Sequence, residues 1–347
     1  MRPSPEPLPG AHFRAEIREQ PEAVARLIDH EVKRVLAFAR SLSRHDLRFV
    51  LIAARGSSDN AARYAQYAFG IACRLPVALA APSLTTLYAR PPRVKDALVI
   101  GISQSGRSPD VVEVVAEARK AGAQTLALVN DPESPLARAA AEVIPLHAGV
   151  ERSVAATKTY TTELAAAALV ALALGKRSEE LAALRRVPAA IFCVLALEGA
   201  AEESARLFHA ATRAAVLARG VNFPTAHEVA LKLKETCLLP AEPFSSADFL
   251  HGPIAVAGSG LPAIVVSPPG GAAARELAAL VRKLAARGSP VLSIGPKGSP
   301  LPLPRLPEIL SPLVAVVPGQ LLALALALSR GLDPDRPRGL RKVTETR

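Results

Sequence analysis

Short apolar runs without polar alternation recur through the first half of the chain. They lie at residues 49–54, 97–102, 125–129 and 143–146. The segments between them place apolar residues at helical spacing, at 59–72, 109–121 and 134–141. Strands that are apolar on both faces and alternate with helices are typical of a parallel sheet that helices cover on both sides. The first half therefore predicts an α/β domain.

The segments on either side of this pattern are different. The first 20 residues are rich in proline and charged residues, and we expect them to form a loose arm. From Pro21 to Phe38 apolar residues return at helical spacing, which predicts one or two packed helices. A further helix is expected near 159–174, followed by a polar linker from Gly175 to Val187.

The second half of the chain repeats the plan of the first. Gly56, after the first apolar run, corresponds to Gly220, which lies 164 positions later, and two further pairs keep this offset. The other pairs are Ser103 with Ser267, Gly106 with Gly270, Gly122 with Gly288 (two positions out of step) and, loosely, Pro145 with Pro318. A repeat of this length indicates one duplicated α/β domain and not a solenoid of short units.

A polar turn follows directly on the apolar run 97–102. It contains Ser103, Gln104, Ser105, Gly106 and Ser108, and Pro109 stands where a helix begins, with Ser108 as its cap. Free backbone N–H groups and the helix dipole favour an anion there, so the turn is a candidate phosphate site. On this stretch alone, an ordinary exposed turn explains the residues equally well. The equivalent turn at 267–271 has lost the glutamine and two hydroxyls, so we expect only the first half to hold phosphate.

Ligands of parallel α/β sheets bind beyond the carboxyl ends of the strands. We expect four stretches to converge at that edge: residues 55–60, 103–108, the loop before the helix at 159, and 219–224.

The last of these stretches leads into a helix that carries Glu228, Lys232 and Glu235 at positions i, i+4 and i+7, on one face. A surface ion-pair ladder is the simpler interpretation of this spacing. The position at the ligand edge favours a general base instead, a carboxylate whose pKa is tuned by burial and by the neighbouring lysine.

Two histidines are candidate site residues by their sequence context. His227 precedes Glu228 as in a zinc-protease helix, but the second histidine that such a helix needs is absent because position 231 is Leu. We reject that interpretation. His251 lies in a turn flanked by glycine and proline, where an exposed histidine without a role is the simpler explanation.

The C-terminal tail, from Asp333 to Thr344, has no helical or strand periodicity and contains two internal prolines. A segment of this kind is often a disordered end. Its prolines also suit an extended strap laid over a site, with Lys342 near the tip. The pattern does not choose between the two.

Composition narrows the class of protein. The chain has 347 residues, enough for about two domains, and no run of 18 or more apolar residues. Cys73, Cys193 and Cys237 lie far apart, with no CxxC pair, and no apolar signal-peptide core opens the chain. We expect a reduced, cytoplasmic protein with no metal site and no membrane partner.

The charge balance is strongly basic, with 42 Lys and Arg against 31 Asp and Glu, a formal net charge of +11. A nucleic-acid partner is disfavoured because no basic run occurs and aromatic residues make up only 4% of the chain. Diffuse positive charge suits the attraction of a small anionic substrate, or simply a solvated surface.

These motifs together resemble the SIS (sugar isomerase) family, in particular the isomerase half of glucosamine-6-phosphate synthase and its stand-alone relatives, the glucosamine-6-phosphate deaminases of that family. The likeness covers residues 45–347 and includes seven motifs in the family's order. The motifs are Gly56-Ser57-Ser58, Ser103 to Ser108, Val154 to Thr161, Gly220 to Pro224, Glu228 to Glu235 with Glu242, His251-Gly252-Pro253, and Pro337 to Thr344.

The resemblance implies an α/β fold of two tandem flavodoxin-like subdomains, each a parallel sheet flanked by helices. We place the phosphate-binding subdomain, with its N-terminal helices, at 21–187, and the subdomain that carries the catalytic helix at 188–330. An N-terminal arm at 1–20 precedes them, and a C-terminal tail at 331–347 closes the site.

The resemblance also implies the roles of individual residues. Glu235 is the base that carries a proton between C1 and C2 of the sugar, supported by Glu228 and Lys232. His251 opens the sugar ring from a neighbouring subunit, so we expect a homodimer with shared sites. Lys342 closes over the substrate and can form an imine with the open-chain ketose. Seven residues bind the sugar phosphate: the phosphate is held by Ser103, Gln104, Ser105 and Ser108, and the sugar is lined by Ser57, Ser58 and Val154.

The family chemistry needs no cofactor and no metal. The synthase carries an N-terminal glutaminase whose nucleophile is a cysteine after the initiator Met, whereas position 2 here is Arg. We therefore expect no glutaminase in this chain. The favoured reaction is then the release of ammonia, from glucosamine 6-phosphate and water to fructose 6-phosphate.

Departures from the family pattern at Arg55, Arg107 and Ala156 leave the sugar specificity open. The enzyme alternatives are another amino-sugar phosphate, such as galactosamine 6-phosphate, or a fructosamine 6-phosphate adduct. A non-catalytic sugar-phosphate-binding regulator is the alternative from another class. The joint presence of Glu235, His251 and Lys342 argues for catalysis, because a sensor needs only the phosphate turn.

Overall fold

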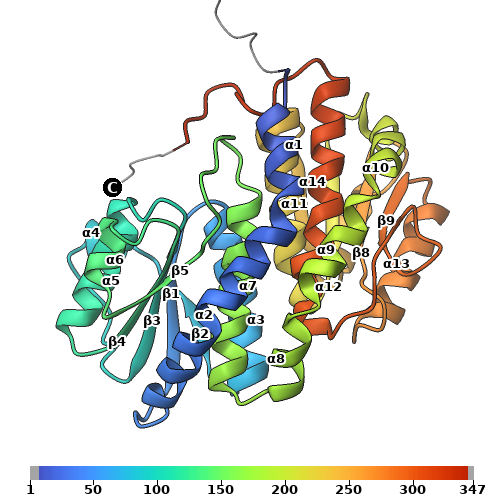
Figure 1. Ribbon diagram of the computed structural model, residues 1–347. Helices are drawn as coiled ribbons and strands as arrows, with labels where there is room; N and C mark the ends of the chain where they lie inside the picture. Colours follow the sequence, from blue (N-terminus) through green and yellow to red (C-terminus); the bar gives the residue numbers. More distant parts are fainter. Residues whose placement is uncertain (1–7, 343–347) are drawn as a thin grey trace, which may run out of the picture.

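Two parallel five-stranded sheets form the body of the structure, a computed structural model that describes residues 8–342 (Figure 1). The first sheet has the order β2-β1-β3-β4-β5 and the second the order β10-β9-β8-β6-β7. The strands of the first sheet are β1 (Phe49–Ala53), β2 (Val77–Leu79), β3 (Ala97–Ser103), β4 (Gln124–Val129) and β5 (Glu142–Pro145). Those of the second are β6 (Ala214–Ala218), β7 (Ala241–Ser245), β8 (Ala263–Val266), β9 (Val291–Gly295) and β10 (Leu301–Pro302).

Numbered within its own half, each sheet has the strand order 2-1-3-4-5, the flavodoxin-like arrangement. All neighbouring strands are parallel. The expectation of two tandem α/β subdomains is therefore confirmed.

Helices fill the space between the two sheets and cover their outer faces (Figure 1). The inner helices are α2 (Gln20–Leu42), α3 (Ser57–Cys73), α7 (Lys158–Leu174), α9 (Val187–Leu195), α10 (Glu198–Ala205), α11 (Phe223–Cys237) and α14 (Pro312–Ser329). The outer helices are α4 (Ser83–Thr86), α5 (Pro109–Lys120) and α6 (Pro135–Ala139) on the first unit, and α12 (Ser246–Leu250) and α13 (Ala274–Ala286) on the second.

One apolar core runs through the middle layer and joins the two halves. It extends from Ile52 of β1, through the buried apolar residues of α7 and α14, to Val216 of β6. Smaller cores lie under the outer helices of each unit. Because the halves share their largest core, they pack as one body. The carboxyl-end edges of the two sheets are therefore held in a fixed position relative to each other.

Helix α14 with its lead-in turn, Glu308–Ser329, is the one helix in residues 8–342 that is long and apolar enough to cross a bilayer. However, 94% of its apolar window is buried inside the molecule. Its neighbours are α11, α10 and α9. Its composition therefore matches that of a central core helix.

Turns that correspond to each other in the two halves share a positive φ at their glycines. Gly56 and Gly220, after β1 and β6, have φ of 57° and 59°, and Gly106 and Gly270 have φ of 63° and 77°. Side chains other than glycine rarely adopt this left-handed region. The match of Pro145 with Pro318 is wrong: Pro145 ends β5, whereas Pro318 lies inside α14.

Two segments differ from the sequence-based expectation. Residues 11–18 form helix α1 (Ala11–Arg18), with Phe13 and Ile17 fully buried, so this part is not a loose arm. The expected polar linker contains a helix, α8 (Ser178–Leu184). Residues 1–7 and 343–347, including Thr344 of the tail motif, lie outside the described residues.

The crossing of α14 and α11 depends on a glycine, which gives a first prediction. A Cβ at Gly319 would overlap the Val229 side chain, which is itself fully buried. We expect Gly319→Ala to lower the free energy of unfolding by about 1–3 kcal/mol, because the packed helices have no room for an extra carbon. Urea denaturation measures the change.

Gly199→Ala is the matched control, because Gly199 lies at an exposed position of α10 and a Cβ there meets no atom within 4 Å. The same loss of stability in both variants would show that the helix crossing is not the cause.

Candidate functional site

The polar turn after β3, the candidate phosphate site, packs closely against the end of β4 and the start of α6. Gly106 allows its tight path, because a Cβ there would lie 2.5 Å from Ser134 Cβ and 2.8 Å from Val129 Cγ2. The Gly106 N–H donates to Ser103 Oγ at 3.1 Å, and the turn then enters α5. Ser108 is the N-cap of α5 but its side chain makes no capping bond, so its hydroxyl is not used within the helix.

Arg55, a departure from the family pattern, has a definite partner in this structure. Its Nε donates to Asp110 Oδ2 at 2.6 Å, and Asp110 is buried in the first turn of α5. Arg107 lies 3.6 Å from Asp131. Both arginines therefore have carboxylate partners at the sheet edge, and neither is an isolated cation.

Helix α11 presents a buried charge network and not a surface ladder. Lys232 Nζ lies 3.3 Å from Glu228 Oε1 and 2.6 Å from Glu235 Oε2. The side chains of Lys232 and Glu228 are fully buried, whereas that of Glu235 is 23% exposed. Of the three, only Glu235 is open to a ligand.

Helix α3 of the first half completes this network. Ser57 Oγ donates to Glu228 Oε1 at 2.9 Å, and Asn60 Nδ2 donates to Glu228 Oε2 at 2.8 Å. Lys232 Nζ also donates to Ser57 Oγ at 3.2 Å. The start of α3 and helix α11 of the second half thus meet at shared polar groups.

Burial and charge act in opposite directions on the protonation of this network. Burial alone would lower the pKa of Lys232, but the carboxylates of Glu228 and Glu235 outweigh it and raise that pKa. Burial raises the pKa of Glu228. Lys232 therefore stays an ammonium and fixes the orientation of the Glu235 carboxylate.

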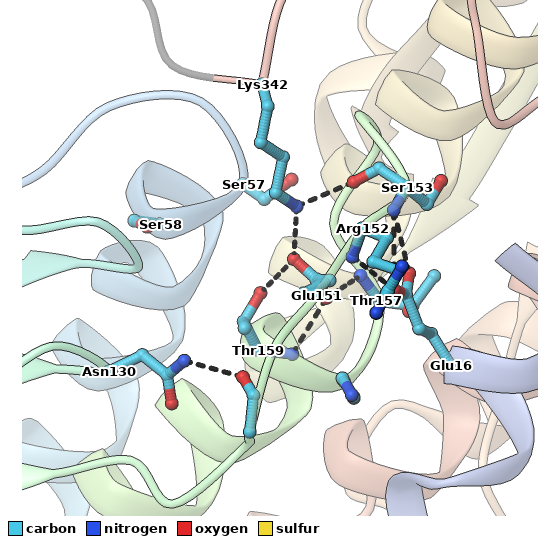
Figure 2. Close-up of polar contacts among 12 residues, drawn as sticks. Glu16, Ser57, Ser58, Asn130, Glu151, Arg152, Ser153, Thr157, Thr159 and Lys342 are labelled. Atoms are coloured by element: carbon cyan, nitrogen blue, oxygen red, sulfur yellow. Dashed lines mark hydrogen bonds and ion pairs between the residues drawn. The ribbon is translucent and has the colours of Figure 1, made fainter. Parts of the chain in front are cut away.

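The tail is an ordered strap at its Lys342 end, which decides between the two interpretations of this segment. Lys342 Nζ donates to Glu151 Oε2 at 2.6 Å and to the Ser153 carbonyl at 2.7 Å (Figure 2). Glu151 also accepts from Thr157 N at 2.9 Å and from Thr159 Oγ1 at 2.8 Å.

Glu151 is a candidate site residue that the sequence analysis missed. Its side chain is fully buried. Burial alone would raise its pKa, but Lys342 and the donors from Thr157 and Thr159 outweigh this effect and lower it. The sequence held one indication of its role: Glu151 is a carboxylate three residues before Val154, in the loop that was expected at the ligand-binding edge.

Ser58 is more enclosed than its predicted sugar-lining role suggests. Its hydroxyl donates to Glu163 Oε1 at 2.7 Å, and Ser58 is 8% exposed. Burial raises the pKa of Glu163 well above its ordinary value, so this carboxyl favours its neutral form. Val154 is half-buried in the loop that carries Glu151.

His251 is held by the outer part of the second unit. It follows α12, whose Phe249 packs into the outer core of the second unit, and its side chain is exposed. No hydrogen bond or ion pair within residues 8–342 joins it to Glu235 or Lys342. Within that same range no His, Cys, Asp and Glu cluster has the arrangement of a metal site.

Comparisons with known proteins add to this geometry. The SIS domain matches residues 45–173 and 207–328. The glutamine–fructose-6-phosphate aminotransferase (isomerizing) of Gloeobacter violaceus is 37% identical over 316 residues, which cover 86% of this chain and 52% of that protein. The chain spans about half the length of the curated relatives it matches.

Solved structures match along the whole two-unit body. A candidate phosphosugar isomerase from Silicibacter pomeroyi has a TM-score of 0.85 at 36% identity, covering 93% of this chain and 99% of that one. The C-terminal domain of glucosamine-fructose-6-phosphate aminotransferase from Francisella tularensis has a TM-score of 0.84 at 27% identity, covering 94% and 98%. Glucosamine-6-phosphate deaminase from Thermotoga maritima shares the fold, with a TM-score of 0.82 at 21% identity, covering 96% and 100%.

The buried ion pair gives the second prediction. Lys232→Met leaves the Glu228 carboxylate buried without its cation, and we expect it to lower the free energy of unfolding by about 3–5 kcal/mol. Lys234→Met is the matched control, because Lys234 lies on the same helix with an exposed side chain. Denaturant titration of both variants makes the comparison, and equal stability of the two would contradict the importance of the pair.

Proposed function

The chain belongs to the SIS domain family, and we propose that it is an amino-sugar phosphate isomerase that releases ammonia. The proposed reaction converts glucosamine 6-phosphate and water to fructose 6-phosphate and ammonia. The observation that carries the proposal is the buried Glu228–Lys232–Glu235 network, in which Glu235 alone is partly open.

Proton transfer next to a carbonyl needs one positioned base and stabilisation of the intermediate. In the open-chain sugar, the Glu235 carboxylate takes the proton from C2 and returns it to C1. The aldehyde and amine thereby become a C1 alcohol and a C2 imine. Water then adds to the imine carbon, and ammonia leaves to give the ketose.

The other residues supply position and charge. Ser103, Gln104, Ser105 and Ser108 hold the phosphate at the N-terminus of α5, far along the sugar from C1 and C2. Ser57, Ser58 and Val154 border the sugar. Such remote binding energy contributes to the correct orientation of the reacting carbons. The amine of Lys342 can exchange with the substrate nitrogen at C2 through an imine.

We also propose that the working form is a homodimer. His251 is exposed, and within residues 8–342 no hydrogen bond or ion pair joins it to Glu235 of its own chain, so a second copy is the source that would bring this imidazole to the site. There it would shuttle the proton that ring opening requires.

The third prediction tests the reaction. Glu235→Gln keeps the shape of the side chain but removes the base, so we expect turnover of glucosamine 6-phosphate to fall by about 10²–10⁴-fold, with substrate binding retained. Ammonia and fructose 6-phosphate are both assayed, and binding is measured by calorimetry. Glu203→Gln, at an exposed position of α10, serves as the control.

A panel with galactosamine 6-phosphate and a fructosamine 6-phosphate adduct identifies the preferred substrate. If the wild-type chain releases neither product from any member of the panel, the proposed reaction is wrong. Undiminished turnover in Glu235→Gln would reject the base.

The fourth prediction tests the shared site. Glu235→Gln and His251→Ala chains are each expected to be nearly inactive alone. In a mixture that re-associates at random, half of the dimers are mixed and each has one intact site, so about a quarter of the wild-type activity returns. No recovery after verified exchange of subunits would mean that His251 acts within its own chain or not at all.

A further inference from the structure

Helix α1 lies outside the residues that match the SIS domain, yet it is packed between the tail and the loop that carries Glu151. Phe13 and Ile17 anchor it in the shared core. Figure 1 shows it at the end of the molecule where the tail leaves α14, and Figure 2 shows its Glu16 beside residues 151–153. The proposed reaction assigns this helix no role.

The tail is fastened to the first turn of α1. Asp335 accepts from His12 N at 2.9 Å and from Phe13 N at 2.7 Å, and Asp333 accepts from Gly10 N at 2.9 Å. The first N–H groups of a helix lack partners within the helix, and carboxylates there also interact favourably with its dipole. The start of the tail is therefore fixed on α1.

The other end of α1 holds the loop. The Glu16 carboxylate accepts from the backbone N–H groups of Arg152 and Ser153, the latter at 3.3 Å, and Glu16 is 3% exposed. The carbonyl of the same residue, Ser153, accepts from Lys342 Nζ at 2.7 Å. A single residue thus separates the Glu16 carboxylate from the Lys342 amine.

We propose that Glu16 is a positioning residue, which holds the 151–153 backbone so that Glu151 and the Ser153 carbonyl fix the amine of Lys342 at the site. These contacts form a closed circuit of hydrogen bonds: Asp335 of the tail binds the start of α1, Glu16 of α1 binds the 151–153 loop, and the loop binds Lys342 at the tip of the tail. The positioning of Lys342 is independent of the reaction, whereas its catalytic consequence rests on the proposed function.

The circuit depends on the charge of Glu16. Burial raises its pKa to about 7; Glu151 of the loop also raises it, and Lys342 of the tail and the two N–H donors lower it. The elements packed around Glu16 carry further charges, namely the Glu19–Lys158 ion pair, between the end of α1 and the start of α7, and Asp335 of the tail. Both N–H groups reach Oε1 of Glu16, and an ionised carboxylate accepts such bonds more strongly than a neutral carboxylic acid does. The hold of Glu16 on the loop therefore weakens as Glu16 is protonated below about pH 7.

The effect on stability has the opposite sign. Since the pKa of Glu16 is higher in the folded chain than in the unfolded chain, its contribution to stability is present at acidic pH and is lost as pH rises through about 7. Burial thus favours the neutral form of Glu16, whereas the positioning of Lys342 uses its ionised form.

The fifth prediction uses Glu16→Gln, with Glu22→Gln on the exposed face of α2 as the matched control. Hydrogen–deuterium exchange of the Arg152 and Ser153 amides, without substrate, is expected to be about 10- to 100-fold faster in Glu16→Gln and unchanged in the control. Unchanged exchange in a folded Glu16→Gln chain would overturn the proposal, whatever the enzyme's substrate.

Turnover supplies the second readout. We expect a lower kcat with little change in KM, and loss of an inflection near pH 7 that the wild type and Glu22→Gln keep. A retained inflection in Glu16→Gln would reject Glu16 as its source. A wild-type chain without turnover would overturn the proposed function alone, since the exchange result stands by itself.

Asp335→Asn keeps the test decisive if Glu16→Gln does not fold. This substitution weakens the hydrogen bonds that Asp335 accepts from the first N–H groups of α1, and it leaves Glu16 in place. Faster exchange is then expected at His12 and Phe13 and also at Arg152 and Ser153, with the inflection near pH 7 retained. Faster exchange confined to His12 and Phe13 would show that the circuit does not transmit from the tail to the loop.

Discussion

A fully buried lysine ammonium between two carboxylates is the constraint around which the site is arranged. An unpaired charge in this position would be very costly, so Lys232 requires Glu228 and Glu235 at their observed distances. Glu228 in turn requires the donors Ser57 and Asn60, which belong to the other half of the chain. The polar groups of α11 are therefore satisfied by both halves of the chain, and this contact holds Glu235, the one partly exposed member of the three, at the junction of the halves.

The two halves of the duplication share the same strand order but differ in the polar side chains that they place at the ends of their strands. Both halves keep the left-handed glycine after their first strand and at the turn after their third. In the first half that turn holds hydroxyls, whereas in the second it contains Pro268 and Pro269, which have no N–H to donate. The second half instead provides the charged helix. The division of labour follows from which backbone and side-chain donors each copy retained.

Local pattern was enough to predict the sheets, their duplication and the shared face of Glu228, Lys232 and Glu235. It could not predict their burial, because a solvent-exposed ladder and a buried network have the same spacing. Helix α1 could not be predicted from the local pattern for a related reason. Its eight residues are short and polar for a helix, and its first turn is capped by Asp335, more than 300 positions away in the sequence. The ordered tail depends on the same distant contacts.

The charge distribution links these parts to the kind of ligand that the site suits. The chain as a whole carries +11, yet four carboxyl groups, those of Glu16, Glu151, Glu163 and Glu228, are buried around the site. The turn at α5 offers hydroxyls to an anion at the N-terminus of a helix. Two of the four carboxyl groups are paired with lysines, Glu228 with Lys232 and Glu151 with Lys342, and burial raises the pKa of Glu163 so that it favours its neutral form. Much of the negative charge buried here is therefore compensated within the chain itself, which leaves the positive excess of the whole chain to act on an anionic ligand such as the sugar phosphate that we propose.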